Sequence, residues 1–177
     1  MRVLATRSAP GTPTRSGGSR RDAAAVLGVM LLLGVLSGLL WSQVVTPAVY
    51  TKLADGGWMG EDQLSRQFGA DAWYVVIAGV AGAVAGALLS WWRDRDPLVT
   101  SGLLLLGASV AAAAMAGAGL LLGPDDAQAA LAAARVGSRV PEQLDVDTVL
   151  VYLSWPVGVL SGALFTLLGR GEEGQRP

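Results

Sequence analysis

Charged and apolar residues occupy separate long blocks along this chain. All 13 basic and 14 acidic residues lie in five stretches. A soluble domain instead mixes polar and apolar residues at a period of 2 or 3.6. Each charge-free run is long enough to supply the roughly 20 residues with which a helix crosses a hydrocarbon layer about 30 Å thick. The four runs, which predict four membrane-spanning helices, are residues 23–51, 72–92, 97–124 and 148–169.

The predicted fold is an all-α membrane protein, a four-transmembrane-helix bundle with a small extracytoplasmic cap. We expect one transmembrane domain over 23–169, between a disordered, basic cytoplasmic tail at 1–22 and a second cytoplasmic tail at 170–177. Pro156 predicts a kink in the last span, because proline removes a backbone donor and clashes with the preceding turn. The expected spans are about 24–45, 72–92, 97–122 and 148–168.

Two outer loops, 46–71 and 123–147, are long enough to form the cap. In the first loop, residues 49–53 favour a strand and residues 55–57 favour a turn, so a short β-hairpin is expected. Residues 61–64 predict the start of a helix that continues toward the second span.

The second outer loop also carries local signals. Residues 125–135 predict a short helix with an acidic first turn, and residues 136–146 predict one irregular strand. The acidic residues of both loops form no spaced set of oxygen ligands around a turn glycine, so solvated charge and helix capping explain them better than a metal site.

The basic residues predict an orientation. With the N-terminus in the cytoplasm, nine Lys and Arg lie inside and four outside, as the positive-inside rule requires. Both termini are then cytoplasmic, in a multi-pass protein of the plasma (inner) membrane. A secretory signal is the alternative for the first run, but no small-residue cleavage site follows it, and it exceeds a signal core of about 7–15 residues. An uncleaved anchor is therefore favoured.

Aromatic residues lie near the ends of the expected spans, where amphipathic rings prefer the membrane–water interface. Those at the outer ends are Trp41, Trp73, Tyr74, Tyr152 and Trp155, and those at the inner end are Trp91 and Trp92.

Small residues recur four apart in the expected spans. Because lipid supplies little hydrophobic drive between helices, close backbone approach at such faces drives their association. These positions are candidates for packing within one bundle, which we favour, or for contact with a second copy or another membrane protein. The candidate pairs are Gly34 and Gly38, Gly82 and Gly86, Gly119 and Gly123, and Gly158 and Gly162.

Residues 34–40 and 158–164 share six of seven residues. A duplicated hairpin, as in repeat-built transporters, is one interpretation. Low-complexity coincidence is the other, and it is favoured because the two spans run in opposite directions and their flanking residues differ.

The composition excludes several kinds of chemistry. The chain has no Cys and no His, so thiol redox chemistry and imidazole ligation of haem or zinc are excluded. It contains no serine-hydrolase elbow, zinc-protease helix, phosphate loop or dinucleotide fingerprint, so we expect neither an enzyme nor a cofactor. A net charge of −1 gives no reason to expect a nucleic-acid partner.

Four short motifs, at residues 38–47, 91–97, 136–141 and 155–158, carry a likeness to known sequences. The chain resembles an uncharacterised family of actinobacterial four-span membrane proteins, classed as a domain of unknown function. The likeness covers residues 24–169 and implies the four-span fold, without an activity or a site.

Two functions remain open. The first is a non-enzymatic accessory or interaction protein of the cell envelope, which contacts the lipid bilayer and another membrane or envelope protein through its small-residue faces or its cap. The alternative is a small transport or channel component for a neutral or small solute. The expected spans contain no ionisable residue, and coupled transporters usually need one at membrane depth, so the first function is favoured.

Overall fold

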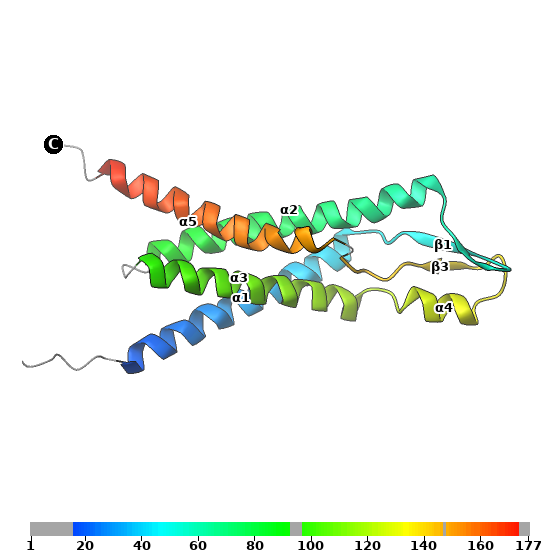
Figure 1. Cartoon of the computed structure of the whole chain (residues 1–177), viewed down its shortest axis with the longest axis horizontal. Coiled ribbons are helices and arrows are strands. Elements are labelled where there is room, and N and C mark those ends of the chain that lie inside the picture. Colours follow the sequence, from blue (N-terminus) through cyan, green and yellow to red (C-terminus); the bar gives the residue numbers. More distant parts are fainter. Residues whose placement is uncertain (1–15, 93–96, 147, 174–177) are drawn as a thin grey trace, which may run out of the picture.

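The computed structural model describes residues 16–92, 97–146 and 148–173. Four long helices lie side by side, and a small sheet and a short helix extend from one end of them (Figure 1). The long helices are α1 (Ser16–Val44), α2 (Glu61–Trp92), α3 (Pro97–Leu122) and α5 (Ser154–Glu173). The shorter elements are β1 (Val49–Leu53), β2 (Gly56–Trp58), α4 (Ala127–Ala133), β3 (Arg139–Pro141) and the 3₁₀-helix η1 (Val149–Leu153).

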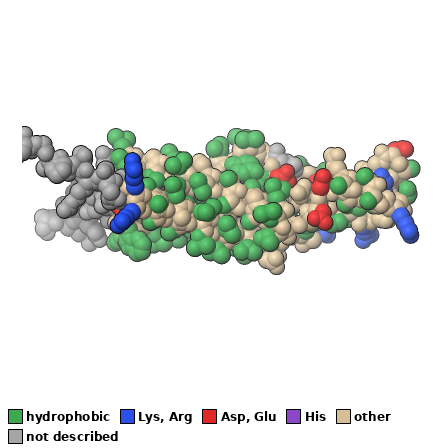
Figure 2. Space-filling model, turned by 90° about the horizontal axis from the view of Figure 1, so that it is seen from below, with side chains coloured by type: hydrophobic (Ala, Val, Ile, Leu, Met, Phe, Trp, Pro, Cys, Tyr) green, Lys and Arg blue, Asp and Glu red, His purple; other side chains and the backbone are tan. Residues whose placement is uncertain are grey.

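Four helical segments are long and apolar enough to cross a membrane, which confirms the coarse prediction from the charge pattern. Exposed Leu, Val and Phe side chains cover much of the bundle. Figure 2 shows these apolar side chains along the helices, with charged side chains gathered in the cap and near the opposite end. The four segments are Arg20–Val44, Glu61–Trp92, Leu98–Ala133 and Val149–Gly169.

The first pair of packed helices is α1 with α3. A Cβ built at Gly34 would meet the backbone of Ala111, and one at Gly38 would lie 2.5 Å from the carbonyl oxygen of Met115. The contacts advance along both helices together, so the two helices run in the same direction (Figure 1). The absence of a side chain at these glycines therefore sets the distance between the two backbones.

The second parallel pair is α2 with α5. A Cβ at Gly158 would lie 2.5 Å from the carbonyl oxygen of Gly79, and one at Gly162 would meet the carbonyl of Ala83. From the other side, a Cβ at Gly86 would meet the carbonyl of Val159. Glycines of both helices thus make this contact possible.

Two buried aromatic residues, Trp41 and Tyr74, join the two pairs. The Trp41 ring lies edge-on to Tyr74, with ring centroids 5.3 Å apart. Trp41 Nε1 donates to the carbonyl of Ala70 at 2.9 Å, and the Tyr74 hydroxyl donates to the carbonyl of Ala112 at 3.0 Å. These hydrogen bonds connect α2 to α1 and to α3, so each polar group of the rings is satisfied inside the protein.

This arrangement corrects the interface prediction for three of the five outer aromatic residues. Trp41, Tyr74 and Trp155 have no exposed surface and pack within the protein, because their size fills the space beside the small residues of the neighbouring helices. Trp73 and Trp92 remain exposed, as an interface position requires.

The repeated heptapeptide lies in α1 and α5, which run in opposite directions (Figure 1). A duplicated hairpin would instead relate the first span to the third. Both copies place two glycines against the carbonyl oxygens of a parallel neighbour, so the shared residues reflect a shared packing requirement.

Several helix boundaries differ from the expected ones. Helix α1 begins at Ser16, so residues 16–22 are helical and not disordered. Helix α5 runs to Glu173, past the expected boundary at 169. Extending an existing helix costs much less than nucleating one, so a long apolar helix continues into polar neighbours. The remaining tail predictions, at 1–15 and 174–177, and the inner link at 93–96 lie outside the described residues.

The predicted kink at Pro156 falls where the last span changes from a 3₁₀-helix to an α-helix. Residues 149–153 form η1, and α5 begins at Ser154, so Pro156 lies in the first turn of α5. A first-turn residue needs no intrahelical partner for its N–H, so proline is tolerated there.

The cap contains the predicted hairpin, formed by β1 and β2. The strand order is β2-β1-β3, and both pairings are antiparallel. The predicted strand at 136–146 is confirmed only over Arg139–Pro141. The predicted short helix is α4, but it covers only Ala127–Ala133 and its first turn contains no acidic residue. Asp126 precedes this turn as the cap, and its carboxylate accepts from the N–H of Gln128 at 2.9 Å. The first outer loop ends at residue 60, because α2 begins at Glu61 as a continuation of the second span.

We expect Gly86→Ala and Gly162→Ala to lower the free energy of unfolding by about 1–3 kcal/mol each, the usual cost of overpacking. Each new methyl group would meet a carbonyl of the opposing helix. The measurement is the midpoint of thermal unfolding in mild detergent. Gly102→Ala is the control, because a Cβ there meets nothing within 4 Å. Equal midpoints for all three variants would contradict the packing described here.

Candidate functional site in the cap

Two amides on the first turns of α2 hold the sheet in place. Gln63 Oε1 accepts from the N–H of Val49 at 3.0 Å. Val49 lies beyond the end of the β1–β2 pairing, which covers Thr51 to Leu53. The Gln63 side chain therefore takes the place of a neighbouring strand. Gln67 lies one turn further along and faces the same side of the helix.

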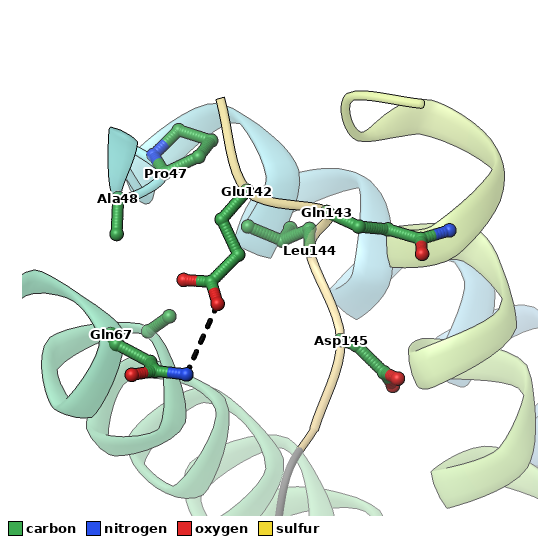
Figure 3. Close-up of a pocket in the computed structure, with 8 residues that line it drawn as sticks. Pro47, Ala48, Gln67, Glu142, Gln143, Leu144 and Asp145 are labelled. Carbon is green, nitrogen blue, oxygen red and sulfur yellow. Dashed lines mark hydrogen bonds between the residues drawn. The ribbon is translucent and has the colours of Figure 1, made fainter. Parts of the chain in front are cut away.

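Glu142 ties the two outer loops together. One carboxylate oxygen accepts from the Tyr50 hydroxyl at 2.9 Å and from Gln67 Nε2 at 3.1 Å. Its backbone N–H donates to the carbonyl of Ala48 at 2.7 Å. Figure 3 shows the Glu142 side chain pointing toward Gln67 beside Leu144. The cavity here has a volume of about 20 Å³, which is room for one water molecule, so Glu142 has a structural role.

One face of the sheet is covered by α4. A Cβ built at Gly57 would lie 2.7 Å from a methyl carbon of Leu131 and 3.4 Å from the Tyr50 ring. Val140, which pairs with Tyr50 across the sheet, is buried. Contact with α4 through this face holds the sheet against the rest of the cap. The opposite face of the sheet makes no part of this contact.

The other face of the sheet lines an open hollow of about 580 Å³. Thr51 pairs with Trp58 on one side and with Arg139 on the other, so these side chains form a row across all three strands. The first two turns of α2 form the opposite wall with Glu61 and Arg66. Side chains of the hairpin, the second loop and α2 thus meet at one place.

The hollow combines an aromatic surface with charges of both signs. The Trp58 side chain is 59 % exposed, and the wall carries the carboxylates of Glu61 and Asp62 and the guanidinium groups of Arg66 and Arg139. Trp, Tyr and Arg are enriched among the residues that contribute most of the binding energy in protein–protein interfaces. This surface suits a partner that offers both an apolar side chain and charged groups.

The other loop carboxylates stabilise the cap locally. Asp145 Oδ1 accepts from the N–H of Val146 at 2.7 Å, and Asp126 caps α4. Among residues 16–92, 97–146 and 148–173, no three acidic side chains gather in a group that would hold a metal ion.

The predicted packing glycines all lie against other parts of this chain. Those of α1, α2 and α5 lie at the two parallel helix pairs, Gly119 lies against the Trp41 ring, and Gly123 lies near Leu144. Their small-residue faces are therefore used for internal packing. A partner that binds through exposed surface has to use a different part of the molecule.

Sequence reasoning missed Glu142 and the hollow. It assigned the loop carboxylates to solvated charge and helix capping, whereas Glu142 accepts hydrogen bonds from Tyr50 and Gln67, which lie 92 and 75 residues away along the chain. The spacing of Gln63 and Gln67 could have indicated that both amides contact the same part of the cap, because residues four apart on a helix lie on one side of it. No motif or spacing in the sequence indicates that Arg66 and Arg139 line the same hollow.

No protein-family model matches the chain, and neither a curated protein nor a solved structure is similar enough to match it. The resemblance to an actinobacterial four-span family therefore stays a prediction.

We expect Glu142→Ala to loosen the cap while leaving the helical bundle intact, because it removes the acceptor shared by Tyr50 and Gln67. The measurement is amide hydrogen exchange, which should become faster in residues 46–60 and 136–146 and stay unchanged in α3. Asp125→Asn is the matched control, since Asp125 is exposed and the cap of α4 is Asp126. Unchanged exchange in both loops of the Glu142→Ala protein would show that Glu142 does not hold them together.

Proposed function

We propose that this protein is a non-enzymatic accessory protein of the plasma membrane that binds another envelope protein through its cap. The observation that carries this proposal is the open hollow around Trp58 and Arg139 on a sheet held to α2 by hydrogen bonds. A preformed surface loses little conformational entropy on binding, so this cap suits recognition of a partner.

The packing of the bundle favours this function over transport. Trp41, Tyr74, Met115 and Trp155 fill the region between the two helix pairs and have no exposed surface. Trp155 Nε1 donates to the sulfur of Met115 at 3.4 Å, so even the indole N–H is used internally. A path for a solute through this region would require these large side chains to move.

The distribution of basic residues supports an orientation with both termini in the cytoplasm. The ends of the chain and the link between α2 and α3 carry nine of the 13 basic residues. In this orientation the cap lies outside the cell, where the partner would be another protein of the envelope.

A photoreactive amino acid at Trp58, introduced in the native membrane, tests the partner proposal. We expect a discrete protein adduct after irradiation, because Trp58 is exposed in the hollow. The same amino acid at Phe165 is the control, since this side chain is 77 % exposed on α5, away from the cap. The adduct at Trp58 should weaken when Arg139→Glu reverses one charge of the hollow.

The masses of the products separate the possible results. An adduct with a different protein supports the proposal, and an adduct of two copies of this chain would instead indicate a homo-oligomer. If position 58 gives no protein adduct, or gives the same adducts as position 165, the cap is not a docking surface.

The orientation can be tested with single cysteines, because the natural chain has none. We expect a membrane-impermeant maleimide to label Asp55→Cys in intact spheroplasts and Arg21→Cys only after permeabilisation. Asp55 lies in the exposed hairpin turn, and Arg21 is exposed at the other end of the bundle. The reverse labelling pattern would overturn the proposed orientation.

A further inference from the structure

A second hollow lies beside the C-terminal end of α1, where α2 continues past it toward the cap. Its volume is about 320 Å³. Val44 and Thr46 line it from the end of α1, and Ser65, Arg66 and Trp73 line it from α2. Arg66 therefore lies between this hollow and the hollow of the cap.

The height of this second hollow along the helices corresponds to the edge of a membrane. Trp73 lies 19 residues before Trp92, the last residue of α2, which is about 28 Å along the helix. The hydrocarbon layer is about 30 Å thick, so Trp73 lies near its outer boundary. Arg66 is two turns further on, about 10 Å beyond Trp73 and at headgroup level.

The chemistry of the hollow changes from apolar to basic in the same direction. Val44 is 42 % exposed and Trp73 is 48 % exposed, so both can contact lipid chains. Arg66 is the one charged residue of the lining. It makes no ion pair with any residue of the described part of the chain. Thr46 adds an exposed hydroxyl beside it.

These features distinguish the two hollows. The cap hollow also contains the carboxylates of Glu61 and Asp62, which would repel an anion. The lining of the second hollow contains no carboxylate, and a guanidinium group binds phosphate oxygens through two parallel N–H donors.

We propose that the second hollow binds the phosphate headgroup of an anionic glycerophospholipid. The Arg66 guanidinium binds the phosphate, the Thr46 hydroxyl donates to the same headgroup, and Val44 and Trp73 contact the first carbons of the acyl chains. The proposal rests on membrane insertion of the four helices. It requires neither the proposed orientation nor the proposed protein partner.

The test uses the full chain in nanodiscs that contain equal amounts of phosphatidylglycerol and phosphatidylcholine. Native mass spectrometry counts the lipids that stay bound after release from the disc. We expect the natural chain to retain phosphatidylglycerol preferentially, and Arg66→Gln to reduce this preference about ten-fold, the effect of losing one charge-assisted contact. Arg139→Gln removes the same charge from the cap hollow alone and should leave the preference unchanged.

Other results would overturn the proposal. Equal losses of the phosphatidylglycerol preference in Arg66→Gln and Arg139→Gln would mean that any arginine of the cap attracts anionic lipid, without a specific site. Displacement of bound phosphatidylglycerol by millimolar inorganic phosphate would assign the site to a soluble phosphate. If Arg66→Gln lowers the unfolding midpoint, Arg66→Lys takes its place, because it keeps the charge but loses the paired donors. An unchanged preference in this variant would overturn recognition of the phosphate by two parallel N–H donors. Incorporation of the chain into the discs tests membrane insertion separately.

Discussion

The structure depends on how closely α1 and α3 approach each other. Two kinds of contact make this approach possible. At Gly34 and Gly38 the backbones of the two helices meet directly, and at Gly107 and Gly119 a bulky side chain of α1 lies over a glycine of α3. This complementarity brings the backbones together without hydrophobic drive from water. The four facing pairs are Met30 with Gly107, Gly34 with Ala111, Gly38 with Met115, and Trp41 with Gly119.

The close contact also determines where α2 lies. Trp41, seated on Gly119, reaches the carbonyl of Ala70 on α2, and this bond lies just below the turns of α2 that carry Gln63 and Gln67. These amides then bind the sheet and Glu142. Packing inside the bundle is thus transmitted to the cap through one continuous helix, and the open hollow forms where that helix faces the sheet.

Local features of the fold were predictable, and contacts between distant segments were not. Long charge-free runs predict helices because length and apolarity are properties of one segment, and the hairpin follows from its turn residues. The glycine pairs look alike in every span, so the sequence cannot tell which helix each pair faces. The hollow of the cap is lined by side chains of β1, β2, β3 and α2. No spacing in the sequence predicts that these side chains lie close together.

A change in the tilt of α2 moves the cap relative to the other end of the bundle, because α2 runs unbroken from Glu61 to Trp92. Its length is about 48 Å, so a change of about 10° in its tilt displaces one end relative to the other by roughly 8 Å. Helices adjust their tilt to the thickness of the surrounding bilayer. The position of the cap above a membrane therefore depends on the thickness of that membrane, and the reach of the proposed docking surface is set in part by the lipid around the bundle.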